Sequence, residues 1–159
     1  MAFRDVARVK KRISDDDCKD ILRNENRGIL SVIGDDGYPY GMPLNHFYND
    51  DDGCLYFHSG KKGHRTDSIL KCDKASYCVH DSGYREEGDW ALTIRSVIVF
   101  GRIEIIDDKE RIYEIARRLS RKFTDDEEYI EKEIERSGPA TMMFLLRPEH
   151  ITGKKVKEA

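Results

Sequence analysis

The sequence lacks the features that mark several specialised protein classes. Its four cysteines, Cys18, Cys54, Cys72 and Cys78, form no Cys-x-x-Cys pair, so a disulfide scaffold is not expected. The longest apolar run, 142–146, is far shorter than the roughly 20 residues that a membrane-spanning helix needs. Neither a G-x-G-x-x-G nor a Walker sequence is present, which argues against a doubly wound nucleotide-binding sheet.

The charge is balanced rather than concentrated in one sign. The chain has 28 Lys and Arg residues against 31 Asp and Glu residues, a net charge of −3, so nucleic-acid binding is not expected. Residues 1–8 lack the apolar core of a signal peptide, which favours a cytoplasmic location without membrane contact. A length of 159 residues suits a single domain spanning 1–159.

A metal site is the weakest of the hypotheses that the cysteines allow. Cys72, Cys78 and His80 carry suitable ligand atoms, but their spacing matches none of the usual zinc patterns. We therefore expect no metal and interpret the cysteines as small buried hydrophobic residues.

Short apolar segments separated by turn residues predict a mainly β protein. Asp-Gly turns at 35–37 and 51–53 are typical of hairpins, because these residues tolerate positive φ. Gly101, inside a long apolar segment, suggests a bulge or a bend of the barrel. The expected strands are 28–34, 38–48, 54–58, 75–80, 90–106 and 141–146. Since they follow one another in hairpins, we expect an α+β fold built on a six-stranded antiparallel barrel with peripheral helices.

Four helices are expected around these strands. Ser14 followed by three aspartates predicts a helix N-terminus, and a second helix should cover 66–71. Two further helices should begin at 107–110 and, with Thr124 as the cap of a capping box, at 124–127. Pro148 is expected to interrupt the last strand and the charged tail beyond it to fray.

The most informative segment is 55–70. Its apolar start ends at Ser59 and leads into a turn with two glycines, Gly60 and Gly63, before a helix begins. Four residues that are or can become cationic lie in this turn: Lys61, Lys62, His64 and Arg65. A glycine turn, a helix N-terminus and cations together suit a phosphate, although the alternative of a solvated basic loop stays open.

Several segments, taken in order, resemble the FMN-binding split-barrel superfamily of pyridoxamine 5′-phosphate oxidase-like proteins. They are 27–32, 36–40, 42–48, 55–59 and 63–65. The sequence YFHS before a basic glycine turn, together with 146–154, is similar to the nitroimidazole-resistance-related (Nim) branch. The resemblance covers roughly 5–155.

This resemblance implies a six-stranded Greek-key split barrel that forms a homodimer, with two FMN sites at the interface and FAD as the alternative cofactor. It places the strand with Leu44, Asn45 and His46 beside the flavin ring. The cofactor phosphate and ribityl chain would contact five residues further along: His58, Ser59, Lys62, His64 and Arg65. The oxidases themselves carry Arg-Lys where this chain has His64-Arg65, and end in a tryptophan-containing strand that it lacks, so the vitamin oxidase activity is not expected.

Three functions remain open at this stage. The first is an FMN-dependent oxidoreductase that passes electrons from a nicotinamide-type donor to a small acceptor such as a nitro compound or a quinone. The second is a flavin-binding storage or sensor protein without turnover. The third is a split barrel that binds haem through His46 or His58. Trp90 could cover a flavin face or belong to the core, and no residue is assigned as a catalytic acid.

Overall fold

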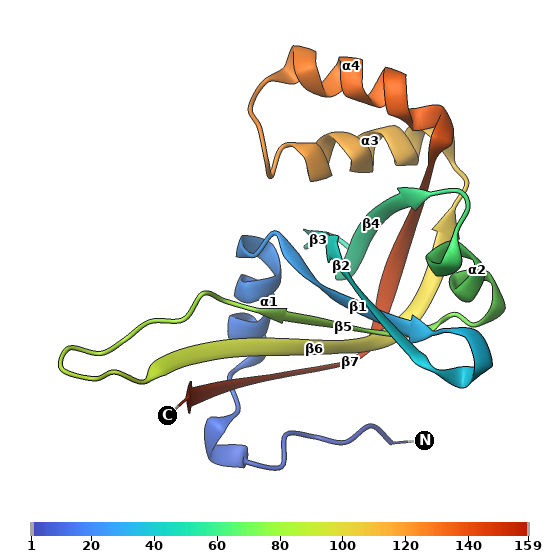
Figure 1. Ribbon diagram of the computed structural model, residues 1–159. Helices are drawn as coiled ribbons and strands as arrows, with labels where there is room; N and C mark the ends of the chain where they lie inside the picture. Colours follow the sequence, from blue (N-terminus) through green and yellow to red (C-terminus); the bar gives the residue numbers. More distant parts are fainter. Residues whose placement is uncertain (1, 159) are drawn as a thin grey trace.

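The computed structural model describes residues 2–158, in which seven strands form one curled antiparallel sheet (Figure 1). The strands are β1 Arg27–Ile33, β2 Pro39–Asn45, β3 Phe47–Asn49, β4 Cys54–Gly60, β5 Lys74–His80, β6 Leu92–Ile106 and β7 Thr141–Glu158. Their order across the sheet is β2-β1-β5-β6-β7-β4-β3. The predicted mainly β, antiparallel α+β fold is therefore confirmed.

The helices lie outside the curled sheet. The α-helices are α1 Asp15–Asn24, α2 His64–Lys71, α3 Lys109–Ser120 and α4 Glu127–Ser137, and the short 3-10 turns are Val9–Lys11, Asp35–Gly37 and Gly138–Ala140. Helices α3 and α4 form an antiparallel hairpin at one end of the molecule (Figure 1). No helix within residues 2–158 combines the length and the apolar character that a membrane crossing needs.

The sheet closes on itself because its two edge strands are nearly continuous in sequence. Strand β2 pairs with β1 and β3 pairs with β4, at opposite edges, yet only His46 separates them. The prediction of one strand over 38–48 is therefore wrong, and the strand count is seven rather than six. The break follows from His46, whose backbone N–H donates to Asn26 O and whose ring is fully buried.

The predicted hairpin turn between β1 and β2 is confirmed. Asp36 and Gly37 have φ values of 54° and 78°, and the Gly34 N–H donates to Tyr38 O at 2.7 Å. Positive φ at both positions matches the twist that a tight hairpin requires, which explains the Asp-Gly pair.

Strands β6 and β7 form the longest ladder of the sheet. Phe100 pairs with His150 and Gly101 with Pro148, so Glu149 is an extra residue and the predicted bulge beside Gly101 is confirmed. The bulge lets β7 continue past a proline that has no N–H to donate. The expected break at Pro148 and the frayed tail are wrong, since pairing continues to Glu158.

Gly101 provides a direct test of this ladder. A Cβ at this position would lie 2.1 Å from Arg147 O, a backbone atom that β-pairing holds in place. Gly101→Ala is expected to lower the free energy of unfolding by about 2–3 kcal/mol, measured by chemical denaturation. Gly41→Ala is the control, because its nearest contact is the movable Ser31 Oγ at 3.3 Å. Equal stability of the two variants would contradict the prediction.

Two apolar clusters hold the helices on the sheet. Helix α1, capped by the Ser14 hydroxyl as predicted, buries Ile21 and Leu22 against the barrel interior. Helix α3 buries Ile115 against the second cluster, which contains Tyr56 from β4. The cap of α4 differs from the prediction, because Asp126 rather than Thr124 accepts the Tyr129 N–H.

Candidate functional site

The basic turn after β4 leads directly into helix α2. Gly63 precedes the helix with a φ of 123°, a conformation that favours glycine, and a Cβ there would meet no atom within 4 Å. The backbone of the turn is therefore open to a ligand. The first N–H groups of α2, from His64 to Thr66, have no carbonyl partner within the helix and carry its partial positive charge.

Arg65 is held in place beside this helix start. Its Nε donates to the Ser59 hydroxyl at 3.0 Å, while the Thr66 hydroxyl donates to Gly60 O at 2.8 Å. Ser59 and Thr66 are buried, so the two bonds fix the turn against the end of β4. Because Nε alone is engaged with Ser59, the other guanidinium N–H groups of Arg65 remain to bind an anion.

The two lysines of the turn add charge that no carboxylate offsets. Lys61 and Lys62 are exposed, and within residues 2–158 neither lies within 4.0 Å of an Asp or Glu oxygen. With Arg65 and the N-terminus of α2, they form a compact cationic site. Cations and free N–H groups in this arrangement suit a phosphate or another compact anion.

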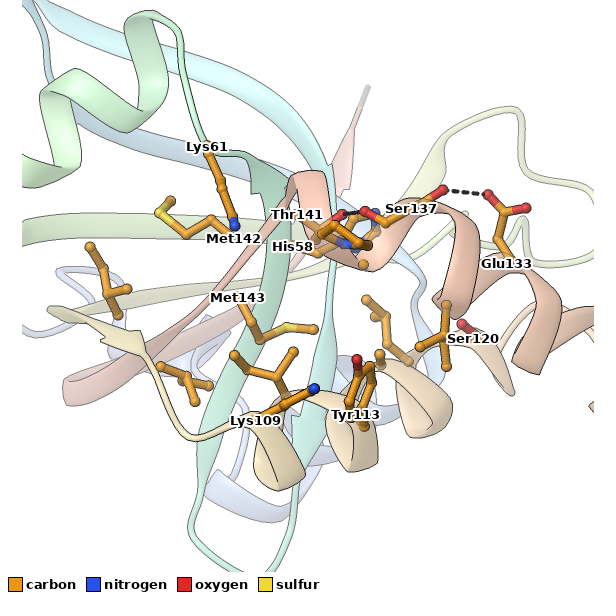
Figure 2. Close-up of a pocket in the computed structure, with 18 of the residues that line it drawn as sticks. His58, Lys61, Lys109, Tyr113, Ser120, Glu133, Ser137, Thr141, Met142 and Met143 are labelled. Atoms are coloured by element: carbon orange, nitrogen blue, oxygen red, sulfur yellow. Dashed lines mark hydrogen bonds between the residues drawn. The ribbon is translucent and has the colours of Figure 1, made fainter.

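A cavity of about 860 Å³ lies next to the cationic turn, between the end of the sheet and the α3–α4 hairpin (Figure 2). Lys61 of the turn and Thr66 of the first turn of α2 both line the cavity, so the turn and the cavity form one continuous site. The helical side contributes apolar residues, and β7 contributes Met142 and Met143 (Figure 2). The volume lies within the usual range for small-molecule sites.

His58 lies on the barrel side of this cavity, at the end of β4. The surrounding atoms restrict its solvation and the nearby Arg65 is positive, and both effects lower the pKa of His58 below its ordinary value. A neutral imidazole can donate one hydrogen bond and accept another, so His58 offers a polar contact without adding charge.

Asn45 also lines the cavity, whereas its neighbours Leu44 and His46 do not. Leu44 packs on the barrel core. The His46 ring is buried, with Nδ1 2.8 Å from the Tyr77 hydroxyl and Nε2 2.7 Å from Leu22 O. Both ring nitrogens of His46 therefore have partners within the fold. Of the two histidines considered as haem ligands, only His58 faces the cavity.

His64 also has partners away from the cavity. Its ring stacks on Tyr40 with 4.0 Å between centroids, and Nε2 lies 3.7 Å from the Asp35 carboxylate. The structure thus brings five of the predicted residues to one site: Asn45, His58, Ser59, Lys62 and Arg65. Leu44, His46 and His64 contact other parts of the chain.

The sequence did not predict the residues that form the helical wall of the cavity. Tyr113 and Phe123 come from α3 and the loop after it, and Ser137 ends α4. The Ser137 hydroxyl donates to the Glu133 carboxylate at 2.9 Å, and the Thr141 hydroxyl donates to Ser137 O at 2.7 Å (Figure 2). These helices have the sequence of ordinary amphipathic surface helices, so no local signal distinguished the residues that line a cavity.

The cysteines form no metal centre in the part of the chain that the structure describes. Residues 2–158 contain no cluster of three or more His, Cys, Asp or Glu side chains that could hold a metal ion. Cys18 and Cys54 are buried as expected, but Cys72 is half-buried and Cys78 is exposed, so the interpretation as buried residues is wrong for these two.

Solved structures of several proteins share the fold of this chain. A candidate 5-nitroimidazole antibiotic resistance protein from Bacteroides thetaiotaomicron is 17% identical, with a TM-score of 0.75 over 92% of this chain and 87% of that chain. An FAD-binding protein from Mesorhizobium loti is 22% identical, with a TM-score of 0.65 over 92% and 97%. An FAD and haem binding protein from Mycobacterium smegmatis is 19% identical, with a TM-score of 0.72 over 94% and 74%.

These identities are low, so the three structures establish the likeness of fold alone. The comparison with curated proteins gives no significant match. The family comparison matches residues 14–155, which is most of the chain, to the pyridoxamine 5′-phosphate oxidase family. This match includes the cationic turn and every strand from β1 to β6. The chain therefore belongs to the pyridoxamine 5′-phosphate oxidase family.

Proposed function

We propose that this protein binds FMN and acts as an oxidoreductase, passing electrons from a nicotinamide-type donor to a small acceptor such as a nitro compound or a quinone. The observation that carries the proposal is the direct junction of a phosphate-type turn with an apolar cavity, through Lys61 and Thr66. A mononucleotide with a planar ring needs a phosphate site and an apolar pocket that are close enough for one ligand molecule to occupy both.

The residues present fit such a cofactor. Arg65, Lys61, Lys62 and the first N–H groups of α2 would hold the phosphate, which the open backbone at Gly63 can approach closely. The cavity would take the ring against its apolar wall. Family membership and the FAD-binding proteins of similar fold support a flavin.

When bound, the flavin supplies the redox chemistry, and the chain supplies orientation and shielding. On the barrel wall, Asn45 of β2 and His58 of β4 are placed to hydrogen-bond a ligand in the cavity. Tyr113 and Phe123 line the opposite, helical side and would shield a bound ring from water, while Met143 of β7 would pack against it from the sheet side. FMN is preferred over FAD because the turn offers one cationic phosphate site. The protein is also expected to form a homodimer with the cofactor near the interface.

The test is an absorption spectrum of the purified protein, with release and chromatographic identification of the chromophore. Flavin bands and released FMN are expected, and consumption of a nicotinamide donor with a nitro or quinone acceptor should exceed that of free FMN. Bound flavin without such turnover would favour storage or sensing. A Soret band would favour haem. A colourless protein that fails to take up FMN would overturn the proposal.

A further inference from the structure

A second, smaller hollow lies where the end of α1, the loop between β5 and β6, and strands β6 and β7 meet. Its volume is about 360 Å³, and none of its lining residues lines the large cavity. We call it the charged hollow. Six side chains in its lining can bind a polar ligand: Glu25, Asp81, Ser82, Tyr84, Arg95 and Lys155. The volume lies within the range of small-molecule sites, about 300–1,000 Å³.

Arg95 of β6 is held in place beside the charged hollow by Asp81. The Asp81 carboxylate accepts from Arg95 Nε at 2.9 Å, and from the backbone N–H groups of Arg95 and Gly83 at 3.0 and 3.1 Å. Only Nε of the guanidinium group is engaged in these bonds. The two terminal nitrogens of Arg95 donate no hydrogen bond within residues 2–158, so they remain to bind a carboxylate.

Lys155 of β7 lies directly opposite Arg95 in the β6–β7 ladder. Like charges directly opposite each other on two paired strands destabilise a sheet. In the part of the chain that the structure describes, no Asp or Glu oxygen lies within 4.0 Å of the Lys155 ammonium group. An anionic group of a ligand would relieve this repulsion by binding to both cations.

The opposite charge comes from Glu25, which ends α1. Its backbone is fixed, because its N–H donates to Ile21 O at 2.9 Å and its carbonyl accepts from Lys122 at 2.8 Å. Between residues 2 and 158 the Glu25 carboxylate has no ion-pair partner within 4.0 Å, although Arg95 and Lys155 line the same hollow. The charged hollow thus keeps opposite charges apart, and a ligand with a group of each sign can bridge them.

The charges around the hollow favour a zwitterion over a simple anion. The lining carries two cations and two carboxylates, so its own charges balance. Two further carboxylates, Asp17 and Asp20 of α1, act on the charge of Arg95, and Arg23 pairs with the second of them. These carboxylates repel a simple anion, whereas they attract the ammonium group of a zwitterion.

Ser82 and Tyr84 add uncharged polar groups from the loop between β5 and β6. Tyr84 and Thr93 exchange two backbone hydrogen bonds, of 3.0 and 2.8 Å, which hold this part of the loop beside β6. Neither side-chain hydroxyl forms a hydrogen bond with another described residue, and each can both donate and accept. The two hydroxyls therefore suit an uncharged polar group of a ligand, such as an amide.

We propose that the charged hollow binds an α-amino acid with an uncharged polar side chain. Arg95 and Lys155 bind its carboxylate, and Glu25 binds its ammonium group. The hydroxyls of Ser82 and Tyr84 contact its side chain. The charged hollow shares no residue with the large cavity, so this inference does not depend on the function proposed above.

The test uses L-glutamine as the probe, titrated into the full chain and followed by the backbone amide NMR signals of Ser82 and Gly83. Saturable shifts are expected. Glutaramic acid lacks the α-ammonium group and 4-aminobutanamide lacks the carboxylate, so each should bind at least about tenfold more weakly than L-glutamine. No saturable shift up to about 20 mM L-glutamine, or equal affinity for all three compounds, would overturn the proposal.

Two variants assign the charges. Lys155→Gln and Glu25→Gln should each weaken L-glutamine binding at least about tenfold, and both should fold because neither side chain has an ion-pair partner among residues 2–158. Lys155→Gln should leave the affinity for 4-aminobutanamide unchanged, and Glu25→Gln that for glutaramic acid. Lys154→Gln, which removes an exposed lysine outside the hollow, is the matched control. An equal loss in Lys154→Gln and Lys155→Gln would overturn the assignment.

Discussion

Replacing Arg65 with alanine is expected to raise the dissociation constant for FMN about 10- to 100-fold, while the dissociation constant for riboflavin stays nearly unchanged. A hydrogen bond to a charged group contributes about 1.5–3 kcal/mol, which corresponds to this range. Among the proposed phosphate ligands, Arg65 has a side chain whose position is fixed, by its bond to Ser59. Riboflavin lacks the phosphate, so its binding reports on the ring pocket alone. Fluorescence titration measures both constants.

His64→Ala is the informative companion to this variant. The sequence predicts His64 as a phosphate partner, but its ring stacks on Tyr40 and faces Asp35. We therefore expect His64→Ala to weaken FMN binding much less than Arg65→Ala. If removal of both side chains leaves FMN affinity unchanged, the phosphate site lies elsewhere. If riboflavin binding falls as much as FMN binding, Arg65 supports the pocket rather than the phosphate.

Stability is expected to fall steeply in acid because of His46. Burial, and secondly the nearby Lys122, lowers the pKa of His46 from 6.5 to about 3. Between these values the unfolded chain takes up a proton that the folded protein excludes, so the free energy of unfolding decreases as the pH falls from 6.5 towards 3. One proton contributes about 1.4 kcal/mol per pH unit, or roughly 3–5 kcal/mol over the whole range.

His46→Gln removes this titration, because glutamine does not ionise. The variant is expected to be less stable than wild type at pH 7, since it cannot reproduce both bonds to Tyr77 and Leu22. Its stability should nevertheless fall less between pH 6.5 and 4, as measured by urea denaturation. Parallel curves for wild type and His46→Gln would show that His46 does not control acid unfolding.

The local signals that held are those whose physics is confined to neighbouring residues. The Asp-Gly turn before β2 needs positive φ, and the Ser14 cap satisfies an N–H three residues away. Gly101 marks a bulge because the opposing backbone leaves no space for a Cβ. The cationic turn between β4 and α2 could also be predicted from neighbouring residues, because its cations and glycines lie next to one another in the sequence.

The predictions that were wrong concern positions whose structure depends on residues distant in the sequence. Pro148 normally ends a strand, but the extra residue in β7 lets pairing continue to the chain end. His46 lies on an alternating segment, yet two distant groups, Tyr77 and Leu22, hold its ring inside. Thr124 has the sequence of a cap, but Asp126 accepts the Tyr129 N–H instead. These structural features depend on contacts with residues far away in the sequence, which a local sequence pattern does not specify.

The sequence by itself determined the antiparallel β class, the hairpin turns and the cationic turn before α2, because each depends on short-range geometry and charge. Only the tertiary structure decided that β2 and β3 are opposite edges of the sheet, and that the α3–α4 hairpin covers a cavity. It also placed Trp90 on an exposed loop rather than in the core, and brought Glu25, Arg95 and Lys155 together around one hollow. These features arise from contacts between segments far apart in the chain, where burial and space outweigh local preference.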